Sequence, residues 1–406
     1  MNSPAMAIPA RHPEAPGAIP ASVRMLAAAM AISKPSPQRW RQIGEDLIVG
    51  DEPMQRLVAW MSRTKEARPI FDRVLGHGLA AVPDAPAPLR EFFGEFEPIP
   101  DWVDMNRVRR GQRALRRGGA DGTYIARDVS FLGGYQFSSF NKTLLRTGVL
   151  EKGSNKRFAE TLQWAMDVTG EGGLEPLGAG YQATIRVRLI HEYVRRHVAA
   201  LPDWRGDEWG LPVNQTDMAA TLVGALIAPA AAGIGLGIVL SPGELEDIAH
   251  MTRYVGWLMG IREDWLPASF RDGVRILYQT LGALSEPDES TKQLAGPMAD
   301  DPLEWHYSAL TGVRRRIARS AHLSVTGSFL GPRTMRKLGL PAFVLPWYPL
   351  VRMPVNLLRS AAALLLPGGQ DRAAARGRRE QEEFMRTMMG DEDTAIGASA
   401  HVMQVA

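Results

Sequence analysis

A histidine between two arginines marks the stretch 181–198 as a candidate cofactor-binding helix. No glycine or proline interrupts the stretch, and at about 100° per residue its apolar positions fall on one stripe. His191 lies on that stripe, and Arg188 and Arg195 border the same face. A neutral imidazole binds haem iron, and two guanidinium groups match the two propionates of haem. The pattern predicts a haem site with His191 as the metal ligand and with Arg188 and Arg195 as cofactor-binding residues. The stripe consists of Thr184, Val187, His191, Val194 and Val198.

The same pattern has a simpler interpretation. A lone histidine on an apolar helix face is more often a core residue than a ligand, and arginines beside such a face usually form its solvated edge. A helical protein without a cofactor therefore stays open as an alternative at this point. His197 lies off the stripe and is expected at the surface.

A second polar pair lies shortly before this helix. A helix is predicted over 155–168, and Arg157 and Thr161 share one of its faces at i, i+4 spacing. The segment 170–180 is rich in glycine, but no strand precedes it and it lacks the glycine spacing of phosphate-binding loops. We expect it to be a tight connection that leads into the helix carrying His191.

The composition excludes several classes of function. The chain of 406 residues is 45% hydrophobic, which is enough for a sizeable core, and its net charge is +3. Basic residues are scattered among acidic ones without interleaved aromatic residues, so nucleic-acid binding is not expected. The absence of cysteine excludes disulfides, thiolate catalysis, iron–sulfur clusters, thiolate-ligated haem and covalently attached haem. Any haem in this protein is non-covalent and has a nitrogen or oxygen ligand.

Helical periodicity recurs along the chain, and neither a period-2 strand pattern nor an internal repeat is found. The sequence therefore predicts an all-α protein with a single domain over 36–367. Residues 1–35, rich in proline and alanine, are expected to form a disordered tail, and 368–406 a charged tail that frays. The N-terminal apolar run is too weakly flanked for an export signal, which favours a cytoplasmic location.

Two apolar stretches bear on membrane contact. Residues 218–243 carry no charge over 26 residues, long enough to span a bilayer, but Pro229 and several glycines interrupt them. A buried core helix followed by a turn is the favoured interpretation. Residues 341–367 are also apolar, and packing on the core is favoured there, with peripheral membrane contact as the alternative.

Several short motifs, taken in their order and spacing, resemble those of one known family. They are Pro100 to Asp104 with Arg110-Gly111, Arg157 to Thr161, Val187 to His191, Val213 to Asp217 with Thr221-Leu222, and Arg253 to Ile261 with Leu266-Pro267. The family is the catalytic domain of latex clearing proteins or rubber oxygenases, which also includes membrane-associated MpaB-type oxygenases. The resemblance spans about residues 95–350.

This resemblance implies a globin-like helical core, with additional helices around a pocket for one haem b. By position, His191 matches the proximal iron ligand of the family, Arg157 its distal arginine and Thr161 the threonine nearby. Latex clearing proteins have a lysine before that threonine, which can ligate the iron, whereas this chain has Glu160. Arg157, Thr161 and Glu160 are therefore the candidate catalytic residues.

The departure at Glu160 affects the distal side of the expected haem. A carboxylate there is predicted to pair with Lys156 or Arg157 along the helix, which leaves the distal position open or bound by water. The catalytic glutamate proposed for the family has no secure counterpart in the segment 140–143. Lys142 in that segment is considered as a substitute amine ligand.

The favoured function is a haem-b-dependent oxygenase that acts with dioxygen on a hydrophobic substrate, such as an alkene or isoprenoid-like molecule or polymer. The first alternative is a haem-binding sensor or carrier without turnover. The second is a helical protein without a cofactor.

Overall fold

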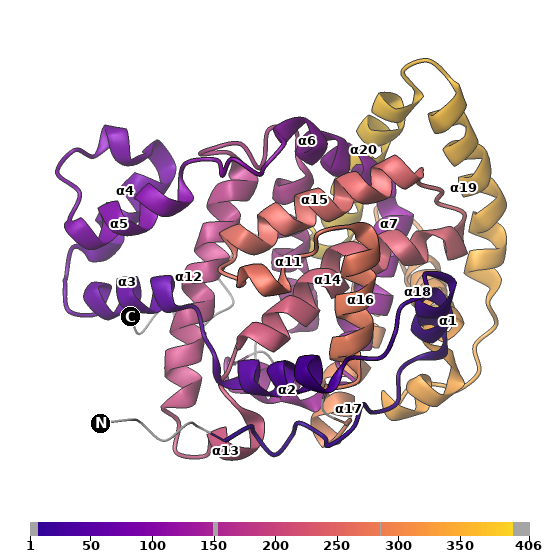
Figure 1. Cartoon of the computed structure of the whole chain (residues 1–406). Helices are drawn as coiled ribbons and strands as arrows, with labels where there is room; N and C mark the ends of the chain where they lie inside the picture. The colour runs from indigo at the N-terminus through magenta and orange to yellow at the C-terminus, as the bar shows by residue number, and fades with distance from the viewer. Residues whose placement is uncertain (1–6, 149–152, 285, 393–406) are drawn as a thin grey trace.

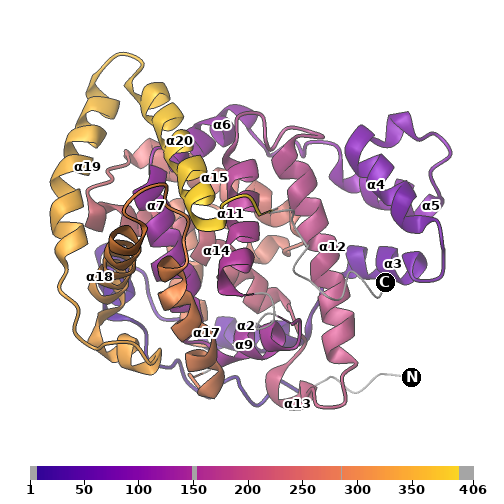
Figure 2. The same ribbon diagram turned by 180° about the vertical axis from the view of Figure 1, so that it is seen from behind.

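The computed structural model describes residues 7–148, 153–284 and 286–392, and in these ranges every regular element is helical. The predicted all-α class is confirmed, and Figures 1 and 2 show the helices from opposite sides. The first part of the chain contains α1 Ala21–Ala29, α2 Pro37–Glu45, η1 Asp46–Ile48, α3 Glu52–Met61, α4 Ala67–His77, η2 Leu79–Ala81, α5 Ala87–Phe96 and α6 Met105–Arg116.

The middle and last parts contain the long helices. The middle part comprises α7 Gly119–Ile125, the π-helical turn η3 Ala126–Phe131, α8 Leu132–Gly134, α9 Ser138–Leu145, α11 Ser154–Thr169, α12 Ala179–Ala199 and α13 Gly206–Trp209. The last part comprises α14 Gln215–Ala232, η4 Gly233–Leu236, α15 Pro242–Leu258, η5 Glu263–Trp265, α16 Phe270–Leu281, α17 Glu289–Asp300, η6 Asp301–Leu303, α18 Thr311–Lys337, α19 Trp347–Leu365 and α20 Gly369–Met389.

The helices α11 and α12 form an antiparallel pair joined by the glycine-rich segment, as the sequence predicts. Gly180 makes their closest approach possible. A Cβ atom on it would lie 2.6 Å from the backbone oxygen of Asp167 and 2.7 Å from Cα of Val168. Any larger side chain would therefore push the two helices apart at this end.

The core around this pair is built from α14, α15 and α16, which pack on one another, while α3, α4 and α5 lie against the other side of α12 (Figure 1). Side chains cap the starts of α14 and α15. The Asn214 side chain accepts from the backbone N–H of Asp217, and Ser241 and Glu244 form a capping box. The helices α14 and α15 thus begin at these capping residues.

One described helix, Gln215–Leu236, is long and apolar enough to cross a membrane by length and composition. In the structure α15 and α16 pack against it, and most of the first three turns of α14 are buried. This arrangement agrees with the predicted core helix followed by a turn. The interruption expected at Pro229 is absent, because the helix continues through this proline to Ala232.

The two predicted tails differ from the structure over their described parts. Within 7–35, α1 packs on α16, Arg11 forms an ion pair of 2.7 Å with Asp217, and the ring of His12 lies 4.6 Å from that of Trp40. These contacts join the segment to residues far away in the sequence. The composition of the segment does not reveal such contacts, and so it suggested disorder. Residues 1–6 lie outside the described residues.

The C-terminal segment also forms a helix instead of a frayed tail. In α20 the apolar residues Phe384, Met385, Met388 and Met389 recur at helical spacing and are buried, whereas most charged residues lie on the other face. The segment was predicted to be a tail because charged residues dominate its composition, although its apolar residues have helical spacing. Residues 393–406 of the predicted tail lie outside the described residues.

Candidate functional site

His191 lies deep in the protein and yet keeps part of its surface accessible. Burial, together with the nearby Arg195 guanidinium, lowers the pKa of its imidazole to about 4. Nδ1 is buried without a hydrogen-bond partner, and the described contacts give Nε2 none either. The ring is therefore neutral at physiological pH. A neutral, unpartnered imidazole nitrogen has the chemistry of a metal ligand.

The register of α11 and α12 places Arg157 level with His191. The indole Nε1 of Trp164 donates a hydrogen bond of 3.1 Å to Oγ1 of Thr184 across the pair. Arg157 comes seven residues before Trp164, and His191 comes seven residues after Thr184. Because the helices are antiparallel, these equal steps lead to the same height.

The facing side chains change along the pair. Near the glycine-rich turn, Trp164 and Thr184 are buried, whereas at the height of His191 the side chains of Arg157 and Thr161 remain partly accessible. The helices are thus closely packed at one end and border accessible space at the other. The predicted metal ligand and the predicted distal residues lie along this part of the pair.

The described partners of Arg157 are aromatic. Its Nη1 lies 3.5 Å from the hydroxyl oxygen of Tyr135, and its guanidinium carbon lies 5.0 Å from the centre of the Phe131 ring. No carboxylate binds it among the residues that the structure describes. Thr161 donates a hydrogen bond of 3.2 Å to the backbone oxygen of Arg157, so its hydroxyl reinforces the helix. Glu160 is partly buried on the same helix, and its predicted pairing with a cation stays a prediction.

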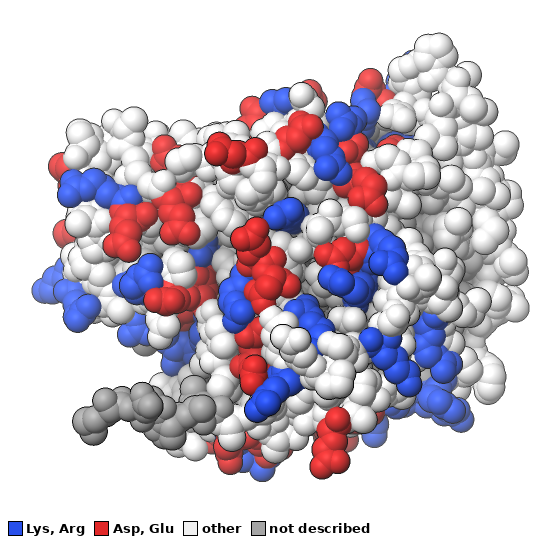
Figure 3. All heavy atoms as spheres, viewed as in Figure 1, with Lys and Arg blue, Asp and Glu red and all other residues white. Residues whose placement is uncertain are grey.

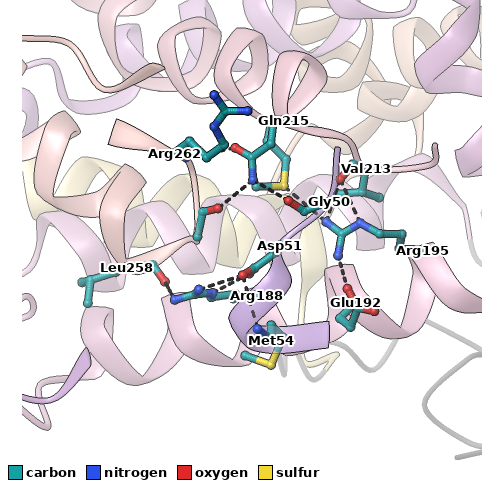
Figure 4. A network of polar contacts seen from close by, with 12 residues as sticks. Gly50, Asp51, Met54, Arg188, Glu192, Arg195, Val213, Gln215, Leu258 and Arg262 are labelled. Atoms are coloured by element: carbon teal, nitrogen blue, oxygen red, sulfur yellow. Dashed lines mark hydrogen bonds and ion pairs between the residues drawn. The ribbon is translucent and has the colours of Figure 1, made fainter. Parts of the chain in front are cut away.

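Arg188 forms a buried ion pair that the sequence analysis did not foresee (Figure 4). Its Nε and Nη2 donate to the two carboxylate oxygens of Asp51 at 2.5 and 2.8 Å, and its guanidinium lies 4.0 Å from the centre of the Phe96 ring. Both partners of the pair are almost fully buried. Gly260 is required beside them, because its φ is +80° and a Cβ there would lie 2.6 Å from Nε of Arg188.

Arg195 is also bound by protein groups. It forms an ion pair with Glu192, one turn earlier on α12, and donates to the backbone oxygen of Val213 at 2.7 and 3.2 Å. Burial raises the pKa of the Glu192 carboxyl, while the Arg195 charge opposes that rise. The arginines beside His191 are therefore buried, neither forms a solvated edge, and each already has a carboxylate partner. Their predicted pairing with propionates stays a prediction and would have to coexist with these partners.

Gln215 links the same region to two backbone segments (Figure 4). Its Nε2 donates to the backbone oxygens of Gly50 and Gly260 at 2.9 Å each, and its Oε1 accepts from the backbone N–H of Arg262. The sequence analysis missed Gln215, Asp51 and Glu192. The i, i+3 spacing of Glu192 and Arg195 was a local signal for one pair, but nothing local relates Asp51 to Arg188.

Lys142, which was considered above as a substitute amine ligand, is bound to other residues in the structure. Its ammonium forms an ion pair with Asp288 and lies 5.4 Å from the centre of the Trp209 ring. Its neighbour Asn141 is fully buried and donates 2.8 Å to the backbone oxygen of Tyr135, while its Oδ1 has no partner. Tyr135 thus connects Asn141 with Arg157, which makes Asn141 a further candidate residue on the side of α11.

One surface pocket among the described residues lies away from the predicted site. A surface pocket of about 690 Å³ between the start of α18 and the end of α20 is lined by His306, Tyr307 and Arg315, and it contains none of the predicted site residues. Within the described ranges, no group of three or more histidine, aspartate or glutamate side chains is arranged to hold a metal ion. A porphyrin needs only one protein ligand for its iron, whereas a protein-only iron site needs several.

Comparison with known proteins gives consistent results. The family described as "ER-bound oxygenase mpaB/B'/Rubber oxygenase, catalytic domain" matches residues 124–365. The rubber oxygenase of Streptomyces sp. (strain K30) is 21% identical over 224 residues, which cover 53% of this chain and 54% of that protein. The chain therefore matches about half the length of this curated relative.

The structure of latex clearing protein LCP in the closed state superposes with a TM-score of 0.62 at 17% identity. The match covers 84% of this chain and 91% of that chain. At this level of identity the likeness shows a shared fold. The segment that carries Arg157, Thr161 and His191 lies within the region matched by the family.

Proposed function

Because the chain belongs to the family of MpaB-type and rubber oxygenase catalytic domains, we propose that it is a haem-b-dependent oxygenase. Its substrate is proposed to be a hydrophobic alkene of the polyisoprene type, and the reaction an oxidative cleavage of carbon–carbon double bonds by dioxygen. The family match supports an oxygenase, and the rubber oxygenase relative supports the substrate class.

The observation that carries this proposal is the state of His191. An imidazole with a pKa of about 4, an unpartnered Nδ1 and a partly accessible ring fits an axial ligand of haem iron. A core histidine would normally satisfy its buried nitrogen with a hydrogen bond, because leaving it unpaired costs about 1–3 kcal/mol. The other ring nitrogen, Nε2, has no partner among the described residues either and is the atom through which this neutral imidazole would bind iron.

The residues of this chain have separate roles in the proposal. Haem, when bound, supplies the iron chemistry that activates dioxygen. Arg157 provides a positive charge at the height of His191, where it would stabilise negative charge that develops during the reaction. Thr161 holds the backbone of this turn through its hydrogen bond to Arg157. Arg188 fixes the orientation of α12 through Asp51, and Arg195 does so through the backbone oxygen of Val213, besides any contact to propionates.

The test is spectroscopy combined with turnover. The protein is produced with an ample supply of iron and haem precursor, and its absorption spectrum is recorded with and without dithionite. Oxygen uptake is then measured with squalene and with dispersed cis-1,4-polyisoprene, and carbonyl products are trapped with a hydrazine reagent. Arg157→Gln should retain haem and lose oxygen uptake by about 100-fold, since a group of this kind typically contributes 10²–10³.

Three outcomes separate the proposals. Haem binding with alkene-dependent oxygen uptake supports the oxygenase. Haem binding without uptake for any alkene favours a sensor or carrier. A colourless protein under these conditions contradicts the haem proposal.

A further inference from the structure

The helix α19 has its polar and apolar faces reversed relative to a helix of a water-soluble protein. Its polar side chains recur at about every fourth position and point into the protein. Tyr348, Arg352 and Asn356 all donate to the buried carboxylate of Asp121, with distances between 2.7 and 3.1 Å. Every one of these inward polar groups has a protein partner.

The same holds further along the helix. Arg359 forms an ion pair of 3.2 Å with Glu380, and Ser360 donates to the backbone oxygen of Gly237 at 3.1 Å. The Ser360 hydroxyl oxygen in turn accepts from the backbone N–H of Val239. α19 is therefore held against the rest of the protein by hydrogen bonds and ion pairs. Its polar side chains make these contacts on the inward side, so the outward side has no polar side chain that would need a partner.

Every exposed residue of α19 is apolar. Leu358 and Leu365 are 74% and 80% exposed. So many exposed apolar residues on one helix are unusual for a soluble protein. The exposed residues are Leu350, Val351, Met353, Pro354, Val355, Leu357, Leu358, Ala361, Ala362, Leu364 and Leu365.

The apolar surface continues onto neighbouring elements. Val313 and Ile317 are exposed on α18, and Ile234 is exposed on η4, which packs against α19. The indole of Trp347 donates to Ser320, one turn beyond Ile317, so the two helices adjoin at this point. In Figure 3 the face over α19 is white, with basic residues gathered below it. We call the exposed apolar residues of α18, η4 and α19 the α19 face.

The segment that forms the α19 face carries charge of one sign. Residues 305–370 include eight arginines and one lysine but no aspartate or glutamate. Arg314, Arg316, Arg333 and Arg336 of α18 are exposed. An apolar surface flanked by exposed arginines is complementary to anionic lipid headgroups above acyl chains.

We propose that the α19 face docks on an anionic lipid bilayer, with its leucines at the acyl boundary and the α18 arginines at the headgroups. A second copy of the chain fits less well, because it would bring two surfaces of the same positive charge together. Backbone groups along α19 are bonded within the helix apart from the break at Pro354, so an interfacial depth, where water reaches, suits it. This inference does not depend on the proposed oxygenase activity.

The test uses the full chain in vesicle flotation. Vesicles of phosphatidylcholine alone are compared with vesicles containing one quarter phosphatidylglycerol at about 0.1 M salt. The protein should float with the anionic vesicles, and about 1 M salt should weaken binding because it shortens the screening length to about 3 Å. Leu358→Ser with Leu365→Ser should reduce the partition coefficient at least ~10-fold, since each leucine loses its apolar contact. Arg314→Gln with Arg316→Gln should reduce it by about 10- to 30-fold, because each arginine near the surface contributes about a factor of five.

Matched controls lie outside the α19 face. Arg41→Gln removes an exposed arginine of α2, and Ile99→Ser removes an exposed apolar residue between α5 and α6. Both should float like the parent, and all variants should keep the parent's circular dichroism. Absence of flotation with anionic vesicles overturns the proposal, as does equal binding to neutral vesicles. A concentration-dependent dimer in light scattering that the leucine changes abolish, without vesicle binding, assigns the face to a second copy instead.

Discussion

Arg157 and His191 lie at the same height on two antiparallel helices, although 34 residues separate them in the sequence. The height is set at the far end of the pair, where Gly180 allows close contact with Val168 and where Trp164 binds Thr184. The positions of a cation and a neutral imidazole along the pair are thus set by contacts that involve neither. This relationship underlies the predictions for the haem site.

We expect His191→Ala to purify without a Soret band while keeping the helical circular dichroism of the parent. The reason is that His191 is the proposed axial ligand, and an alanine offers no donor atom to iron. His197→Ala is the matched control, because His197 is exposed on the same helix and should leave haem content unchanged. Equal haem content in His191→Ala and the parent would remove His191 as the ligand.

Arg188→Gln is expected to lower the free energy of unfolding by about 3–5 kcal/mol, because it leaves the Asp51 carboxylate buried without its partner. Urea denaturation of the cofactor-free protein measures this. Arg188→Leu combined with Asp51→Leu should recover most of the loss, since neither charge then remains.

Arg41→Gln serves as the comparison for that prediction. Arg41 pairs with Glu45 at an exposed position, so its loss should cost less than about 1 kcal/mol. If Arg188→Gln costs no more than this exposed change, the buried pair does not anchor α12.

The stability of the cofactor-free protein should depend on pH through His191. The unfolded imidazole has a pKa of 6.5, whereas the folded one has a pKa of about 4. Between these values the unfolded state binds a proton that the folded state does not, so the free energy of unfolding falls as the pH decreases from 6.5 to 4. Above pH 6.5 this contribution is complete.

The measurement compares the parent with His191→Gln across this range. His12, His250 and His322 also have lowered pKa values, chiefly through burial, and contribute in the same direction in both proteins. Their effect cancels in the difference between the two curves. Parallel curves would show that His191 does not titrate as described.

The resting ferric protein is expected to be high-spin, with azide and imidazole binding directly to the distal side. Glu160 stands where latex clearing proteins have a ligating lysine, and Lys142 is bound to Asp288. Glu160→Lys should shift the spectrum toward low-spin, while Glu160→Gln should leave it high-spin. A low-spin parent that becomes high-spin in Lys142→Ala would contradict this arrangement.

The elements that carry the site were accessible from the sequence because their patterns are local. The stripe through His191, the glycine-rich turn before it and the capping box at Ser241 depend on residues a few positions apart, and the structure contains all three. The family motifs then gave the pairing of Arg157 with His191, which no local pattern could supply.

Contacts between distant segments could not be predicted in the same way. The partner of Arg188 lies 137 positions away at Asp51, and the residue that makes room for the pair is Gly260. The composition of α20 concealed its buried face, and the apolar side of α19 was expected inside the protein. The polar residues of α19 face inward because the buried carboxylate of Asp121 accepts their hydrogen bonds.

The meeting of Asp51, Arg188 and Gly260 also sets an order of events during synthesis. The ribosome releases Asp51 first and Gly260 last, so α12 lacks its final contacts until more than half of the chain has emerged. Before that point the pair of Asp51 and Arg188 lacks the segment around Gly260 that packs against it. Capture of the proposed haem is therefore expected at a late stage of biogenesis, after the chain around residue 260 has joined the core.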